Sequence, residues 1–351
     1  MEVTEISVLL QKLSNAHGIS GFESSVAKII RDEVAPFVDE VTTDKMGNLI
    51  AVKKGDDFKI MLAAHMDEIG LMVQFVDDHG FIRFVGIGGW YNPVLVSQRV
   101  LLHGEKGVVR GVLGTKPPHV MSDEDRKKPV GFEDMFIDVG ATSPEEVEAL
   151  GISVGTPVTI DREFAQLSGT VVTGKAFDNR AGCAMLIGAL REMETKHTIY
   201  AVFTVQEEVG LKGAKTSSFT LNPDVAIATD VTIPGDSPGI ERRKAPVFMG
   251  KGPVVVAVSA SGRGHIADPR VVSWLVKTGK KFDIPVQVEV GDGGNTDASA
   301  INFERGGIPS VPVSVPARYI HSPVEVVDLR DVQAGISLIA KAVATQPKLR
   351  S

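Results

Sequence analysis

The spacing of hydrophobic and polar positions predicts helices and strands at both ends of the chain. Apolar residues recur at helical spacing over 6–13 and 26–34, which predicts two helices. Residues 20–23, Ser-Gly-Phe-Glu, have the spacing of a capping box with the serine at the N-cap of the second helix. The nearly continuous apolar run 59–64 is typical of a strand buried on both faces of a sheet. The chain therefore begins with the pattern of an α/β fold.

Between about residues 68 and 164 the pattern changes. Short β-branched segments alternate with turn signals such as Asp-Asp-His-Gly at 77–80, and only 144–150 has a helical pattern. Several short strands at this spacing predict a small β-barrel or sandwich. Within it, residues 116–129 are rich in proline and charge and predict a loop.

From about residue 165 the alternation of helices and strands returns. Further helices are predicted over 180–193 and 269–280, from 298 onward and over 328–344. Further strands are predicted over 38–41, 49–52, 198–205, 225–229, 284–290 and 311–315. This alternation predicts a three-layer α/β/α domain with a mainly parallel sheet. We expect residues 1–67 and 165–351 to form that discontinuous domain, and residues 68–164 to be inserted into it.

Composition excludes several classes of protein. The chain has 351 residues, 37 of them basic and 44 acidic, and a net charge of −7, which argues against a nucleic-acid partner. No apolar run approaches the ~18–20 residues of a membrane span, and acid stands where a signal peptide needs base. The single cysteine, Cys183, predicts a reducing, cytoplasmic location. It also excludes a multi-cysteine metal site, so any metal ligands must be mainly His, Asp and Glu.

Polar clusters follow the ends of several predicted strands. They occupy residues 64–68, 176–180, 205–209, 228–231 and 319–322. In open α/β sheets, ligands bind outside the carboxyl ends of the strands. Clusters that are distant in the sequence are therefore expected to converge at one edge of the sheet.

Two of these clusters contain adjacent or alternating titratable residues. In extended backbone His65 and Asp67 face the same side, so the histidine can bind a metal while the carboxylate orients its ring. The ordinary alternative is a histidine bonded to a loop carbonyl. Glu207 and Glu208 diverge if the backbone stays extended, so one can bind a metal while the other faces the substrate. Their alternative is a solvated loop.

Three other candidates also have ordinary explanations when each is taken alone. Asp178 precedes an apolar helix and has the position of an N-cap. Asp230 follows a strand and has the position of a turn aspartate. His321, before Ser-Pro, has the surroundings of a loop histidine. The metal interpretation gains strength only when these residues are considered together.

Together these residues suit a two-metal site. His65 and Asp230 would hold one ion, Glu208 and His321 the other, and Asp178 would bridge the two. Three carboxylates and one shared hydroxide balance the charge of two divalent ions, which in such sites lie ~3.5–4 Å apart. Ligation by oxygen and nitrogen suits Zn²⁺, the first expectation here, and also Co²⁺ or Mn²⁺.

Glu207 is then left free to act as the general base. The shared hydroxide would attack the substrate, and Asp67 would orient His65. The residues therefore predict a metal-dependent hydrolase.

Five motifs resemble the tetrahedral (TET) dinuclear metallo-aminopeptidases. They are His-Met-Asp-Glu-Ile-Gly at 65–70, Phe-Asp-Asn-Arg at 177–180, Gln-Glu-Glu-Val-Gly at 206–210, Asp-Val-Thr at 230–232 and Arg-Tyr-Ile-His-Ser at 318–322. The resemblance covers essentially the whole chain and includes leucyl, glutamyl and lysyl aminopeptidases of archaea and bacteria. It implies an enzyme that removes N-terminal residues from peptides, whose free α-amine an acidic site can bind. The pairing of residues to ions given above is also that of the family and rests partly on this resemblance.

The resemblance implies properties that composition and spacing do not. It implies that residues 68–164 form a PDZ-like dimerisation domain, and that dimers build a hollow tetrahedral dodecamer that degrades peptides inside. The Gly-rich segment 291–297 resembles the family's pocket-lining loop, and Asp292 within it would favour a basic P1 side chain, the residue released. The alternative for Asp292 is a solvated turn residue.

Two other functions compete with the peptidase. Chains that resemble this family have been labelled endoglucanases, but glycoside hydrolysis needs two carboxyl groups that flank the bond. Glu207 and Glu208 do not offer that pair if Glu208 binds a metal. A non-catalytic peptide-binding scaffold that uses the inserted domain would not need a complete ligand set.

Overall fold

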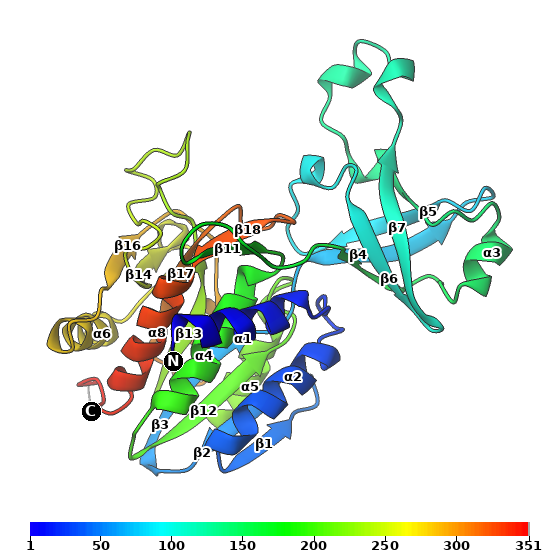
Figure 1. Ribbon diagram of the computed structural model, residues 1–351. Coiled ribbons are helices and arrows are strands. Elements are labelled where there is room, and N and C mark those ends of the chain that lie inside the picture. Colours follow the sequence, from blue (N-terminus) through cyan, green and yellow to red (C-terminus); the bar gives the residue numbers. More distant parts are fainter. Residues whose placement is uncertain (350–351) are drawn as a thin grey trace.

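The computed structural model describes residues 1–349, apart from the side chain of residue 125. A twelve-stranded sheet forms the larger part, and a closed six-stranded barrel projects from it (Figure 1). At the centre of the sheet four strands run parallel in the order β12 (His197–Thr204), β3 (Asp56–His65), β13 (Val225–Thr232) and β17 (Ser310–Arg318). This parallel centre is the part of the sheet that strand–helix alternation predicts.

Antiparallel strands extend the sheet at both edges. On one side lie β2 (Leu49–Lys53) and β1 (Glu40–Thr43). On the other side lie β18 (Glu325–Asp328), β11 (Val171–Gly174) and β10 (Ala165–Gln166). A separate branch from β17 contains β14 (Val254–Ser259), β15 (His265–Ile266) and β16 (Gln287–Val290).

Helices cover both faces of the sheet, which confirms the three-layer α/β/α prediction. The helices are α1 (Val3–Asn15), α2 (Ser24–Val34), α4 (Phe177–Glu192), α5 (Lys212–Leu221), α6 (Pro269–Lys281), α7 (Asp297–Ile301) and α8 (Leu329–Ala342). Alternate residues of β3 enter opposite cores: Leu62 packs in the core with α1, α4 and α8, and Ala63 in the core with α5 and α7. This two-sided burial explains the continuous apolar run 59–64. Among the described residues, no helix has the length and apolarity needed to cross a bilayer.

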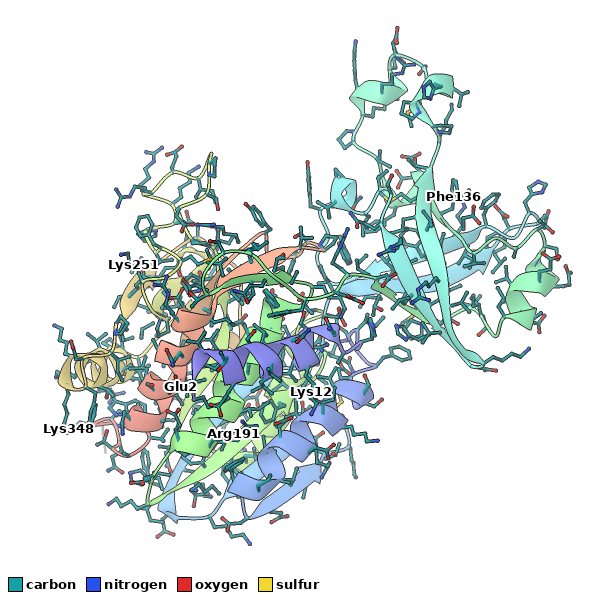
Figure 2. The ribbon with its side chains drawn as sticks, viewed as in Figure 1. Glu2, Lys12, Phe136, Arg191, Lys251 and Lys348 are labelled. Atoms are coloured by element: carbon teal, nitrogen blue, oxygen red, sulfur yellow. The ribbon has the colours of Figure 1, made fainter. Side chains whose placement is uncertain are left out.

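The inserted segment folds as a closed barrel with its own core. Its strands are β4 (Gly70–Val76), β5 (Ile82–Ile87), β6 (Arg99–Gly104), β7 (Gly107–Thr115), β8 (Met135–Asp138) and β9 (Pro157–Ile160). A short helix, α3 (Pro144–Ala149), closes its far side. Short 3-10 turns lie at Ala35–Phe37, Asn92–Val94, Pro118–Val120, Asp125–Lys127, Phe132–Asp134 and Ala260–Gly262. In Figure 2 the barrel, marked by Phe136, stands clear of the sheet domain, marked by Arg191 and Lys251.

A buried polar junction joins the barrel to the sheet domain. His17 Nδ1 and His103 Nε2 both lie 2.8 Å from the hydroxyl of Thr159 in β9. The Trp90 indole donates a hydrogen bond to the Gly70 carbonyl over 2.9 Å where the chain enters the barrel. Burial lowers the pKa of His17 to about 4, so this histidine is neutral at pH 7. Of these contacts, the one between Thr159 and His17 links the barrel directly to the segment after α1.

The predicted capping box at residues 20–23 is wrong. The second helix begins at Ser24 with Glu23 at its N-cap. The Ser20 hydroxyl instead donates a hydrogen bond to Asp67 Oδ2 over 2.6 Å. Asp67 is fully buried, and a buried carboxylate is costly unless donors surround it. Ser20 therefore forms a hydrogen bond with a buried acid that is distant in the sequence, and it does not cap the helix as the local pattern predicts.

Candidate active site

The predicted polar clusters meet at the carboxyl edge of the parallel strands. His65 ends β3, Asp230 lies near the end of β13, and Glu207 and Glu208 follow β12. Asp178 lies in the first turn of α4, and His321 lies in the segment after β17. All six line one cleft with a volume of about 1050 Å³. The structure thus gathers in one place residues that lie up to 256 positions apart, from His65 to His321.

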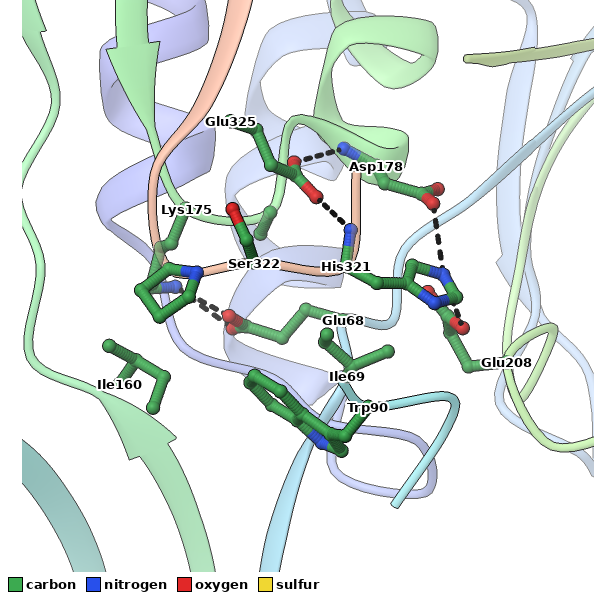
Figure 3. A pocket seen from close by; sticks show the side chains of 12 residues that line it. Glu68, Ile69, Trp90, Ile160, Lys175, Asp178, Glu208, His321, Ser322 and Glu325 are labelled. Carbon is green, nitrogen blue, oxygen red and sulfur yellow. Dashed lines mark hydrogen bonds and ion pairs between the residues drawn. The ribbon is translucent and has the colours of Figure 1, made fainter. Parts of the chain in front are cut away.

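Asp178 lies between the two histidines. Its Oδ1 is 3.1 Å from His65 Nε2, and its Oδ2 is 3.3 Å from His321 Nε2. The same His321 nitrogen is 3.3 Å from Glu208 Oε2 (Figure 3). One carboxylate oxygen thus faces each histidine, which is the arrangement that a bridging ligand requires.

Two overlapping groups of donor atoms could each hold a metal ion. His65, Glu207 and Asp230 form one group, and His65, Asp178 and Glu208 form the other, each with its donor atoms within 4.8 Å of one another. Glu207 Oε2 lies 3.8 Å from His65 Nε2, so position alone allows Glu207 to be a ligand or a base. These nitrogen and oxygen donors fit two divalent cations.

The electrostatics of the cluster also favour cations. Burial, together with repulsion from Asp178, raises the pKa of the Asp230 and Glu208 carboxyl groups. Burial opposes protonation of His321, but its contacts with Asp178 and Glu208 outweigh burial and raise its pKa to about 11. Burial likewise favours neutral Asp178, yet its hydrogen bonds with the two histidines lower its pKa. The excess of carboxylates over basic groups is what bound divalent ions would neutralise.

Asp67 connects the first histidine to the two glutamates. Its Oδ1 lies 3.5 Å from His65 Nδ1 and accepts the backbone N–H of Glu207 over 3.0 Å. Its Oδ2 accepts the backbone N–H of Glu208 over 3.2 Å, in addition to the Ser20 hydroxyl. His65 Nδ1 lies closer to the backbone carbonyl of Asp67, at 3.1 Å. Asp67 therefore orients the ring mainly through its carbonyl and holds the turn through its carboxylate.

The two glutamates lie in a turn, and not in extended backbone as strand alternation assumes. Strand β12 ends at Thr204, and Gln206 has the left-handed φ of 55°. The backbone N–H of Gln206 donates to Glu23 Oε1 over 3.1 Å. Both glutamates reach the surroundings of His65 from this turn, which Asp67 holds through their backbone N–H groups.

Glu325 is a positioning residue that the sequence reasoning missed. Its carboxylate accepts the backbone N–H of Asp178 over 2.8 Å and that of His321 over 3.0 Å (Figure 3). It is buried, and burial together with the charge of Asp178 raises its pKa. The sequence feature that could have indicated this role is an acid between Val324 and Val326, in a segment that otherwise has the pattern of a buried strand.

A buried ion cluster beneath the site was missed as well. Glu68 lies 2.8 Å from Lys175 Nζ and 3.5 Å from an Arg180 guanidinium nitrogen. Glu68 also accepts the backbone N–H of Gly18 over 3.0 Å. The cluster joins the segments that precede the barrel and α4, and so supports both His65 and Asp178.

The barrel contributes one wall of the site through the loop after β5. A Cβ atom on Gly89 would lie 3.1 Å from His321 Nδ1. A Cβ on Gly88, which has a φ of 78°, would lie 3.3 Å from Glu208 Oε2 and 2.6 Å from Ile69. Only glycine allows this loop to approach the histidine and the glutamate so closely.

Asp292 lines the same cleft but is exposed. It lies in the loop between β16 and α7, and the Ser261 hydroxyl donates a hydrogen bond to its carboxylate. At the end of that loop Asp297 is buried, with Oδ2 accepting the Thr204 hydroxyl over 2.5 Å. Burial raises the pKa of Asp297 to about 6.

A three-layer α/β/α domain with histidines and carboxylates clustered at its strand ends has the ligands that a metal-dependent hydrolase needs. The chain belongs to the M42 glutamyl aminopeptidase family, whose sequence model matches residues 47–338.

Individual relatives extend the likeness to almost the whole chain. The lysyl aminopeptidase of Pyrococcus furiosus is 37% identical, with 97% of each chain covered. A TET aminopeptidase structure from a marine-sediment thaumarchaeote is 39% identical, with a TM-score of 0.94 over 98% of this chain and 97% of the other. The TET1 peptidase of Pyrococcus horikoshii, described as assembling into a tetrahedron or a large octahedral shell, is 34% identical, with a TM-score of 0.86 over 98% and 99%. A Thermotoga maritima structure described as an endoglucanase is 32% identical, with a TM-score of 0.78 over 95% and 96%.

Proposed function

We propose that this protein is a dinuclear metallo-aminopeptidase that removes N-terminal residues from peptides in the cytoplasm. The observation that carries the proposal is the placement of Asp178, with one carboxylate oxygen facing His65 and the other facing His321. His65 and Asp230 would hold one ion, and Glu208 and His321 the other. When bound, such ions polarise a scissile carbonyl and lower the pKa of an attacking water.

The chain's own residues would do the remaining work. Glu207, at the cleft wall, would take the proton of the attacking water and pass it to the leaving amine. Asp67 would hold the His65 ring and the Glu207 backbone in place. The acidic cleft would bind the substrate's protonated α-amine, which restricts cleavage to the first peptide bond.

The metal-loaded enzyme should cleave leucyl-anilide and leave N-acetyl-leucyl-anilide intact. The expected ratio of kcat/KM is at least about 10³, because acetylation removes the charge that the acidic cleft would bind. Mass spectrometry of a longer peptide should show residues leaving one at a time from the N-terminus. Equal cleavage of the free and blocked substrates would contradict the proposal.

The glycosidase alternative is less compatible with this geometry. The paired carboxyl groups of glycosidases lie ~5–9.5 Å apart. Here Glu207 and Asp230 have donor atoms within 4.8 Å of each other, and so do Asp178 and Glu208. Chelator-resistant cleavage of cellulose would favour the description given to the Thermotoga relative.

We further propose that residues 68–164 act as a dimerisation domain and that dimers assemble into a dodecamer. The barrel projects from the sheet domain and exposes Phe75, Val108 and Val112 at 56%, 59% and 49% (Figure 1). The TET relatives support closed assemblies of this kind.

Light scattering on the purified protein should give about 450 kDa, since each chain is 37.4 kDa. A mass twice as large would match the octahedral alternative described for the TET1 relative better than a dodecamer. A strictly monomeric species over micromolar to millimolar concentrations would overturn the assembly proposal.

A further inference from the structure

We propose that Glu289 forms the base of the P1 subsite and selects a lysine side chain. This inference rests on the proposed aminopeptidase function and names the substrate class of that same cleft. Sequence reasoning assigned this role to Asp292, which lines the cleft at an exposed position. Glu289 lines the same cleft but is only 5% exposed.

Strand register places Glu289 on the sheet face that carries the metal candidates. Asp230 of β13 pairs with Ser314 of β17, and Ser314 pairs with Val254 of β14. On the other side of β14, Val256 pairs with Glu289 of β16. Paired residues and residues two apart share one face of a sheet. A single face therefore runs from Asp230 through Ser314 to Glu289.

A contact with Thr232 fixes the distance between the metal candidates and Glu289. The Thr232 hydroxyl donates a hydrogen bond to Glu289 Oε2 over 2.8 Å. Thr232 lies two residues beyond Asp230 on the same strand, which corresponds to about 6.6 Å. The extended four-carbon stem of lysine reaches roughly 6 Å from its Cα. A lysine held with its carbonyl at the metal cluster would thus bring its ammonium group to Glu289.

The base of the cleft has unused acceptors. Within residues 1–349, Glu289 forms no salt bridge with a lysine or arginine. The Ser314 and Ser259 hydroxyls are buried, line the cleft, and have no hydrogen-bond partner among the described residues. Burial raises the pKa of the Glu289 carboxyl group, as expected for an acid without a cation nearby. An ammonium group, which is a cation with three donors and no acceptor, would supply the partner that the Glu289 carboxylate lacks.

The walls of the cleft fit the apolar stem of the same side chain. Ile240, Val256 and Ile320 line the same cleft as the metal candidates and Glu289. The two lysines of the lining, Lys215 and Lys244, are exposed, so they do not neutralise the buried carboxylate at the base. The subsite is thus apolar along its sides and anionic at its end, as lysine requires.

The first test compares substrates on the wild-type, metal-loaded enzyme. Lysyl-anilide and norleucyl-anilide have side chains of similar length and differ in the terminal charge. We expect kcat/KM for lysine to exceed that for norleucine by about 10-fold or more. A ratio near one, or a preference for norleucine, would overturn the subsite. Failure to cleave any aminoacyl-anilide would instead overturn the proposed function.

The second test changes the carboxylate. Glu289→Gln keeps the shape and an oxygen that can accept the Thr232 hydrogen bond, and should lower the lysine-to-norleucine ratio about 10- to 100-fold. Glu194→Gln, an exposed change in the same domain, is the matched control and should leave the ratio as it is. If the ratio is unchanged in Glu289→Gln but falls in Asp292→Asn, the exposed Asp292 and not Glu289 selects lysine. If Glu289→Gln does not fold, the wild-type comparison decides alone.

Discussion

Replacing Glu207 with glutamine is expected to lower kcat by about 10²–10⁴-fold, the usual contribution of a general base. The glutamine cannot accept a proton from the attacking water, whereas the contacts that shape the site are retained. The turn is held by the Glu207 backbone N–H, which donates to Asp67 over 3.0 Å, and glutamine keeps an oxygen that can face His65. KM should change little, because the substitution removes a step of the reaction and leaves the cleft intact.

Metal content distinguishes a base from a ligand at this position. Glu207, His65 and Asp230 are close enough to hold an ion, so Glu207→Gln could also fail by losing metal. We expect Glu207→Gln to retain two ions per subunit by elemental analysis, whereas Glu208→Gln should bind fewer. Glu194→Gln serves as the exposed control for both measurements. Loss of metal in Glu207→Gln would make Glu207 a ligand, and full peptidase activity would exclude it as the general base. Peptide binding without cleavage by the wild type would favour the non-catalytic scaffold.

The parts of the fold that local sequence predicts are those with a strong repeating pattern. The run through Leu62 and Ala63 predicts a central strand because its two faces enter two cores. Helix α5 was missed because Lys-Gly-Ala-Lys-Thr-Ser-Ser has few apolar residues at helical spacing, and it is held by packing on β12 and α7. Ser20 was misassigned because its partner, Asp67, is distant in the sequence. Tertiary contacts decide such positions, and a local pattern does not contain them.

The candidate site divides in the same way. Residues such as His65 and Asp230 can be found because they stand in polar clusters directly after apolar strands. Glu325 and Glu289 lie inside strands, where an isolated acid has the appearance of a solvent-facing position. Their burial depends on strand pairing that only the folded sheet provides. For this reason sequence patterns reveal the residues that would bind the ions. They do not reveal the residues that hold the backbone of those ligands or that define the subsite.

Removal of metal should abolish peptide cleavage and destabilise the protein. Dialysis against a chelator is expected to reduce activity to background, and addition of Zn²⁺, Co²⁺ or Mn²⁺ should restore it. A ligand that binds only the folded state at 100 times its Kd stabilises that state by about 2.7 kcal/mol, so Tm should fall on chelation. Repulsion among Asp178, Glu208 and Asp230 would add to the loss.

Asp178→Asn gives this prediction its sharpest form. Because one Asp178 oxygen faces His65 and the other faces His321, the substitution should weaken binding of both ions. His321→Ala should weaken binding at the second position only, where Glu208 is its partner. Titration of each metal-free variant, followed by calorimetry and by Tm, would separate the two sites. Two unaltered affinities in Asp178→Asn would exclude a bridging carboxylate, and chelator-resistant peptide cleavage by the wild type would exclude metal dependence itself.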